Sequence, residues 1–255
     1  MFAYVPPRER SMTDHAEAAS SALAKLSVAL TICALAFLAC RLEPASATSV
    51  YTYGKNEYRI VRDGLAPNKR LSIAAHGEGE DAEDDFHLYL IAEPAHGKIA
   101  PLEEIGPELL DTGADAYRAT WSSDSRHFAV HYRVSRHIGA LKLYGIEHDH
   151  AYEVTVPSLF REVLKRGAVE EERQCATSIE AEWLDNTRLL LKEYSVFETV
   201  SPALAGAAGR FGRLEGPETR NGEKLYFLTF SARAVCELAP RNTCQIIGLT
   251  PEPFD

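Results

Sequence analysis

Three stretches of the chain share one layout, and this repetition constrains the fold more than any other feature. They are LAPNKRLSIA (65–74), WSSDSRHFAV (121–130) and WLDNTRLLLK (183–192), and they align without gaps on a shared arginine. Each has a bulky apolar residue, several turn formers, a basic residue and then an apolar run. Pro, Asn, Asp and Ser favour turns, whereas the flanking residues favour extended backbone. The layout therefore predicts a β-hairpin that is used three times.

Each hairpin is followed by a further strand that carries a Leu-Tyr pair, in FHLYLIAE (86–93), ALKLYGIE (140–147) and EKLYFLTF (223–230). The third pair lies farther from its hairpin, and we attribute the distance to segment 201–221, a Gly- and Ala-rich stretch predicted to be a flexible insertion. Such a unit cannot bury its apolar face alone, so neighbouring sheets must stack to form the core. Six residues are expected to mark this core: Leu65, Trp121, Trp183, Tyr89, Tyr144 and Tyr226.

The layout from Trp121 to Val130, followed by a strand with a Leu-Tyr pair, resembles the blade motif of TolB-like (WD-like) β-propellers. The third row has Asn186 at the aspartate position, and the first row lacks the tryptophan. The resemblance implies an all-β fold of tandem antiparallel sheets, propeller-like with three to four blades, either closed or open. One or two short helices are expected in the connections, at 103–111 and 157–167. The resemblance implies no particular activity, because propellers host both enzymes and binding platforms.

The N-terminal region contains an uncharged apolar run at 26–40. This run is shorter than the roughly 20 residues that span a bilayer, and ASA (45–47) has the small-x-small pattern of a secretory cleavage site. We therefore predict an export signal over 1–47, cleaved after Ala47, and a single domain over 48–255 that is periplasmic or extracellular. An uncleaved membrane anchor at 26–40 is the alternative.

The charge balance limits the class of partner that the protein is expected to bind. The chain has 27 basic and 37 acidic residues and a formal net charge of −10. Binding to a phosphate backbone depends on clustered Lys and Arg, so this balance argues against nucleic acid and against anionic membrane surfaces. The expected partner is a protein or a cell-envelope component, with no membrane span after signal removal.

The cysteines fit an exported protein, which meets an oxidising compartment. Cys236 and Cys244 flank ELAPRNT, whose Pro and Asn favour a turn, so the two can close a short loop as a disulfide; whether they are bridged stays open. Cys40 leaves a second alternative at the N-terminus, a lipoprotein acylated at this residue. No cysteine or histidine spacing is typical of zinc, and no metal and no cofactor are predicted.

The basic, histidine-rich stretch 126–140 is the main candidate for a ligand-binding face. On a strand, His127, His131 and Arg133 share one face because side chains alternate. Such a face suits an anionic ligand, or it pairs with the acidic run GEGEDAEDD (77–85), which we interpret as a solvated loop. Two further histidines, His148 and His150, have a spacing that metals use, but a polar turn is the simpler interpretation.

The sequence contains no nucleophile elbow, H-E-x-x-H motif, P-loop or dinucleotide fingerprint. We therefore predict an exported, non-catalytic binding or scaffolding module of the cell envelope. The alternative is an exported hydrolase-like or metal-dependent enzyme whose site combines the His/Arg face at 126–137 with neighbouring carboxylates. A catalytic site requires His127, His131 or His148 to meet a carboxylate in a concave pocket, whereas a binding module leaves them dispersed.

Overall fold

The strands follow one another along the chain as three antiparallel groups. The computed structural model describes residues 50–77, 85–102, 105, 111–148, 150–164, 173–240 and 242–253. Group 1 comprises β1 (Arg59–Leu65), β2 (Leu71–Gly77), β3 (Phe86–Ala92) and β4 (Gly97–Pro101). Each of these strands pairs with the next in antiparallel fashion.

Groups 2 and 3 repeat this up-and-down order. After a short 3₁₀ turn (Ala114–Ala116), group 2 comprises β5 (Arg118–Trp121), β6 (His127–Ser135), β7 (Ile138–Glu147) and β8 (His150–Val154). Helix α2 (Leu159–Leu164) leads to group 3, which comprises β9 (Arg173–Trp183), β10 (Arg188–Thr199), β11 (Gly212–Arg220), β12 (Glu223–Ala239) and β13 (Thr243–Pro251). In group 3, β12 pairs with β10, β11 and β13, so β11 is an addition to the simple order.

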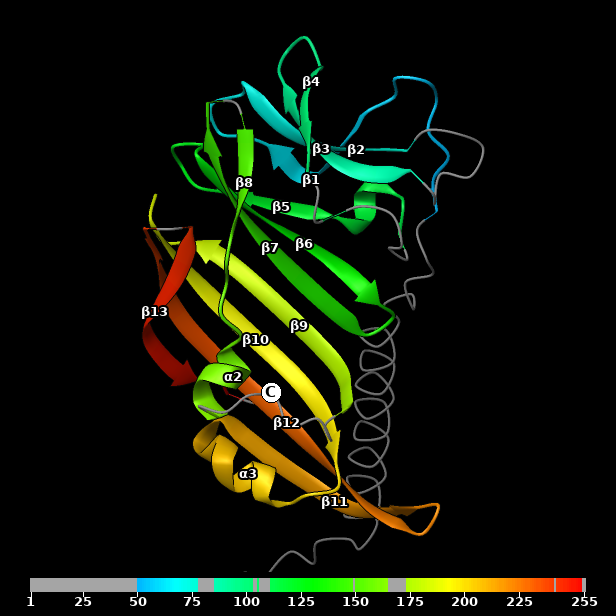
Figure 1. The fold of residues 1–255 in the computed structure, drawn as a ribbon, viewed down its shortest axis with the longest axis vertical. Coiled ribbons are helices and arrows are strands. Elements are labelled where there is room, and N and C mark those ends of the chain that lie inside the picture. The colour runs from blue at the N-terminus through cyan, green and yellow to red at the C-terminus, as the bar shows by residue number, and fades with distance from the viewer. Residues whose placement is uncertain are drawn as a thin grey trace, which may run out of the picture. The chain divides into compact units, whose positions relative to one another are not determined.

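Parallel contacts join the three groups into one mixed sheet of 13 strands (Figure 1). β1 pairs with β5 at Arg62 and Arg118, and β7 pairs with β9 at Ile138 and Thr177. The path of the sheet runs from β11 to β4, and within the described residues these two ends do not pair. The predicted all-β fold is therefore confirmed, and the sheet is open.

The three aligned stretches each form a hairpin turn, as the layout predicts. In the first turn the Arg70 amide donates to Asn68 Oδ1 at 2.8 Å, and in the second the Arg126 amide donates to Asp124 Oδ1 at 3.1 Å. A side-chain oxygen that accepts from the backbone two residues later is the local interaction that makes Asn and Asp turn formers. The same chemistry therefore builds both turns.

The third turn is one residue shorter. The residue at the aligned apolar position pairs with the seventh residue after it in the first two hairpins, Leu65 with Ser72 and Trp121 with Phe128. In the third hairpin Trp183 pairs with Leu189, the sixth residue after it. Accordingly Asp185 and not Asn186 accepts from the Arg188 amide, at 2.8 Å. The gapless alignment of the third row is wrong by one residue from the turn onward.

Two hydrophobic clusters lie on opposite faces of group 2. Along β6, Phe128 and Val130 belong to the cluster shared with group 1, whereas Ala129 belongs to the cluster shared with group 3. β7 divides in the same way, with Tyr144 on the first side and Leu143 on the second. Because side chains alternate along a strand, group 2 is buried on both faces by its neighbours.

Segment 201–221 corrects one prediction. It forms helix α3 (Ala203–Ala208), a 3₁₀ turn (Gly209–Phe211) and β11, so the prediction of a flexible insertion is wrong. Leu204 and Ala208 are buried in the cluster shared by groups 2 and 3, and Figure 1 shows α3 beside α2 over the strands of group 3. Alanine is the best helix former, and burial of these two side chains stabilises the short helix.

The third Leu-Tyr pair is not equivalent to the other two. Tyr89 pairs with Ala74 and is buried, and the buried Tyr144 pairs with Phe128, in both cases near the hairpin turn. Tyr226 instead pairs with Thr199, at the far end of β10, and is half-buried. The long interval before Tyr226 therefore comes from the length of β10 and β12 as well as from the added segment.

Several predicted features lie outside the described residues. These are the export signal at 1–47 with its alternatives, nearly all of the helix expected at 103–111, and the acidic run at 78–84. The second expected helix is present as α2. Among the helices that the structure describes, none has the length and hydropathy needed to cross a membrane.

Candidate functional site

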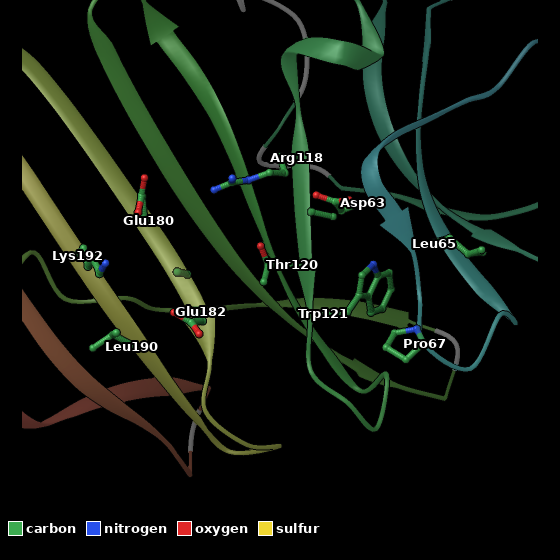
Figure 2. Close-up of a pocket in the computed structure, with 12 residues that line it drawn as sticks. Asp63, Leu65, Pro67, Arg118, Thr120, Trp121, Glu180, Glu182, Leu190 and Lys192 are labelled. Carbon is green, nitrogen blue, oxygen red and sulfur yellow. The ribbon is translucent and has the colours of Figure 1, made fainter.

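A groove lies along β1, β5 and β9, the first strand of each group. One part of it, with a volume of about 510 Å³, is shown in Figure 2 and is lined by residues of these strands and of β10. An adjoining cavity of about 390 Å³ extends toward the β6–β7 turn. Arg118 and Glu180 line both cavities, so we treat them as one feature, the inner groove.

Two tryptophan hydrogen bonds hold the three strands at their spacing. Trp121 Nε1 donates to the carbonyl oxygen of Gly64 at 3.1 Å, and Trp183 Nε1 donates to that of Thr120 at 2.9 Å. Each acceptor directly precedes the aligned apolar position of the hairpin before it. The two tryptophans expected in the core thus link neighbouring groups, and Trp121 also lines the groove. Leu65, the third residue at this position, is 46% exposed, and among the described residues no strand group precedes it.

The hairpin turns make further links between groups. Asn186 Oδ1 accepts hydrogen bonds from the Ser123 hydroxyl at 2.6 Å and from the Asp124 amide at 3.1 Å. The Asn68 amide donates to Ser125 Oγ at 3.0 Å. One end of the groove is therefore bordered by a chain of three turns that hydrogen-bond to one another.

The first part of the groove carries both charges and an aromatic side chain. Its lining includes Trp121, the carboxylates Asp63 and Glu182, and Lys192. In Figure 2, Arg118 extends from β5 across the groove toward β9, where Glu180 lies. This mixture suits a polar ligand that offers both an apolar surface and ionic groups.

The second part of the groove, which we call the arginine pocket, is lined by Arg62, Arg118, His131, Arg133 and Arg136 among others. Three of these form a row across strands. Arg62 is the register partner of Arg118, and Arg118 is the register partner of His131. Register partners project from the same face of a sheet, so three basic side chains stand side by side.

Arg133 forms an ion pair with a buried carboxylate. Its Nη2 and Nε donate to the two carboxylate oxygens of Asp111 at 2.8 and 3.0 Å. The Asp111 side chain is only 2% exposed, and a two-bond pairing of this kind is the strongest that an arginine makes with a carboxylate. Arg133 therefore has a structural role at the wall of the pocket.

His131 is held in one tautomer. Its Nδ1 lies 3.0 Å from the carbonyl oxygen of Ile179, and since a carbonyl only accepts, Nδ1 carries the proton. Nε2 is buried and has no hydrogen-bond partner among the described residues. Burial is the largest effect on the pKa of His131 and lowers it. The hydrogen bond to the Ile179 carbonyl opposes this, and the charges of Arg118 and Glu180 have smaller effects that lower and raise the pKa respectively. The imidazole is therefore neutral at pH 7.

The structure brings together two of the three residues of the predicted ligand-binding face. His131 and Arg133 line the arginine pocket. His127 lies instead against Trp183, with ring centroids 5.9 Å apart, and burial lowers its pKa.

Of the other two histidines singled out in the sequence, His148 lies in the turn between β7 and β8, as the simpler interpretation has it, and His150 is the first residue of β8. Both are exposed, and His148 has a left-handed φ of 49°. In the part of the chain that is described, no group of three side chains is placed to hold a metal ion.

Two features of the structure were not predicted from the sequence, and the second of them lies outside the inner groove. Arg62 and Arg118 gave no signal, because their adjacency depends on the parallel pairing of β1 with β5. Glu193 was also missed. Its side chain accepts from the Leu159 amide at 2.9 Å and from the Ser195 hydroxyl at 3.3 Å, and burial raises its pKa. The alternation of buried residues along β10 is the signal that could have identified it.

The two cysteines considered for a bridge face each other across β12 and β13. The Cα atoms of Cys236 and Cys244 are 5.8 Å apart, which is within the usual range for a disulfide, and the structure joins their sulfur atoms. Both residues belong to the cluster shared by groups 2 and 3. A bond here would tie the last strand to the core.

Comparison with known proteins adds no identification. No model of a protein family matches the chain, and no curated protein is significantly similar to it.

Proposed function

We propose that this protein is an exported, non-catalytic binding module of the cell envelope, built as an open β-propeller-like array, and that it binds its ligand in the inner groove. The three strand groups are the blades in this proposal. The resemblance of the Trp121–Val130 layout to TolB-like blades supports it, as do the stacked faces of group 2. The negative net charge favours a protein or envelope component over nucleic acid.

One observation carries the proposal. The groove is built from the same part of each group, because β1, β5 and β9 are the strands that lead into the three aligned hairpins. Trp121 and Trp183 hydrogen-bond between these strands at corresponding positions. A concave surface lined by several rigid strands is a common place for a ligand, since its side chains are held in position before binding.

Capture of a partner from envelope extract tests the proposal when it is made to depend on the groove. Lys192→Glu reverses a charge in the groove, whereas Ile247→Asp changes a side chain of β13 that is 54% exposed and does not line it. We expect the full chain and Ile247→Asp to retain the same partner, and Lys192→Glu to lose it. Equal capture by both variants would contradict binding in the groove.

The export part of the proposal has its own test. N-terminal sequencing of the exported product should begin at Thr48. A product that begins at Cys40 would instead support acylation, and the uncut chain in the membrane fraction would support an anchor at 26–40.

A hydrolase-like or metal-dependent enzyme is the second candidate, and one observation favours it. His131 shares a concave pocket with two carboxylates, Asp115 and Glu180. However, its Nδ1 is bound to the Ile179 carbonyl, and the structure gives no hydrogen bond from His131 to either carboxylate. Hydrolysis of a chromogenic ester that is abolished by His131→Asn would support the enzyme, and equal rates for the two proteins would exclude a role for His131.

A further inference from the structure

The arginine pocket concentrates positive charge on an acidic protein. Four arginines and two histidines line it, against the two carboxylates Asp115 and Glu180, in a chain whose net charge is −10. Its volume of about 390 Å³ lies in the range of roughly 300–1,000 Å³ that is typical of small-ligand sites. Charge and size therefore both suit a small anionic group.

The two arginines of the row across β1, β5 and β6 repel each other. Arg62 and Arg118 are direct register partners, and His131 is the next in the row. Like charges directly opposite each other in a sheet are destabilising. An anion placed against the row would replace this repulsion by attraction.

The arginines of the pocket differ in how they are engaged. Arg133 is bound in two hydrogen bonds by Asp111. For Arg62, Arg118 and Arg136, in contrast, the described residues provide no ion pair and no side-chain hydrogen bond. Because a guanidinium group offers five N–H donors, these three retain donors for a ligand.

His131 adds a polar atom without a partner. Its Nε2 is buried and makes no hydrogen bond within the part of the chain that is described. His131 stands beside Arg118 in the row. Buried side-chain nitrogen atoms almost always have a partner in native proteins. A ligand in the pocket can supply one.

From these contacts we infer that the arginine pocket binds an oxyanion, the carboxylate or phosphate group of the ligand that occupies the inner groove. The inference rests on the proposed function and names the chemical group that the groove recognises. Arg62 and Arg118 supply the charge from neighbouring strands, and Arg136 supplies it from the β6–β7 turn. Carboxylate and phosphate both accept two parallel hydrogen bonds from one guanidinium group.

Calorimetric titration of the full chain with citrate and with inorganic phosphate, at low ionic strength, tests this inference. We expect saturable binding of at least one anion, weakened at least tenfold by Arg118→Gln. Arg210→Gln is the matched control, because Arg210 does not line the groove. Its Cζ atom lies 5.4 Å from the centroid of the Phe211 ring. Binding of citrate alone identifies a carboxylate ligand, and binding of phosphate alone identifies a phosphate ligand.

A stability measurement shows whether the Arg118→Gln variant is folded. In anion-free buffer, Arg118→Gln should unfold at the same temperature as the unaltered chain or at a higher one, because the substitution relieves repulsion in the row. Addition of the anion should raise the unfolding temperature of the unaltered chain and of Arg210→Gln but not that of Arg118→Gln, since a ligand stabilises only the state that binds it.

Two results would overturn the inference: no saturable binding of either anion, or equal binding by Arg118→Gln and Arg210→Gln. If the anions fail to bind while Lys192→Glu still abolishes partner capture, the oxyanion site is wrong and the binding module stands. If the anions bind as expected but Lys192→Glu and Ile247→Asp capture the partner equally, the oxyanion site stands and the proposed function fails.

Discussion

The indole of Trp183 hydrogen-bonds to the backbone of Thr120 at 2.9 Å, across the boundary between two strand groups. The indole of Trp121 makes the corresponding bond to Gly64 at 3.1 Å. One side-chain type at one position of the hairpin thus makes the same contact with the preceding group twice. These bonds fix how far the first strands of the groups stand from one another.

Trp183→Phe should therefore lower the free energy of unfolding by about 1–2 kcal/mol, because it keeps a ring in place but leaves the carbonyl without its donor. Trp121→Phe should have an effect of similar size. Tyr194→Phe is the control, since this side chain is 44% exposed. Urea denaturation measures all three, and a Trp183→Phe protein as stable as the control would show that the bond contributes nothing.

Gly64 is predicted to tolerate no side chain. A Cβ atom at this position would lie 2.7 Å from the carbonyl oxygen of Ile73, so Gly64→Ala should cost more than about 2 kcal/mol through backbone displacement. Gly206→Ala is the matched control, because nothing lies within 4 Å of its added Cβ atom and it is in helix α3. That change should stabilise the protein by about 0.5–1 kcal/mol. Thermal unfolding of the two variants should differ in sign.

His131 should make the protein less stable as the pH is lowered. Its pKa in the folded protein is lowered by burial, so the folded state binds fewer protons than the unfolded state. Stability is then complete above the unfolded pKa of about 6.5 and is lost as the pH falls through the folded pKa. His131→Asn, which keeps a donor for the Ile179 carbonyl, should reduce the difference in unfolding free energy between pH 7.5 and pH 5. An unchanged difference would mean that His131 does not titrate in this range.

Glu193 should have the opposite pH dependence. Burial raises its pKa, so its contribution to stability is complete below the unfolded pKa and is lost as the pH rises through the folded pKa. Glu193→Gln keeps an oxygen for the Leu159 amide and should gain stability relative to the unaltered chain as the pH rises from 5 to 8. Glu193→Ala removes the acceptor and should cost about 1–3 kcal/mol. Denaturation curves at both pH values distinguish the two variants.

Alkylation followed by mass measurement tests the proposed bridge. Without reductant, Cys236 and Cys244 should remain unmodified while Cys175, which is free and partly exposed, is labelled. With reductant, all three should react in the unfolded chain. Labelling of Cys236 and Cys244 before reduction would show that the disulfide is absent.

The local parts of the fold could be predicted from the sequence, and the non-local parts could not. The turn at Asp124 and the helix near Leu159 follow from short-range preferences, and both are present. The shortened third turn was not predicted, because Asp185 and Asn186 are adjacent and chemically alike. The alignment could not show which of the two side chains accepts the hydrogen bond from the backbone. The row of Arg62 and Arg118 depends on parallel pairing between residues far apart in the chain, which no local pattern encodes.

The two-sided burial of group 2 has a consequence for how this architecture tolerates change. Neighbouring positions of β6 serve different clusters, Phe128 one and Ala129 the other. The outer groups each share only one such seam, so either can be redesigned or exchanged while half of the interior is left undisturbed. A change in group 2 affects both clusters, because its strands contribute side chains to each of them. Any attempt to shorten, extend or permute the array would therefore have to keep group 2 intact.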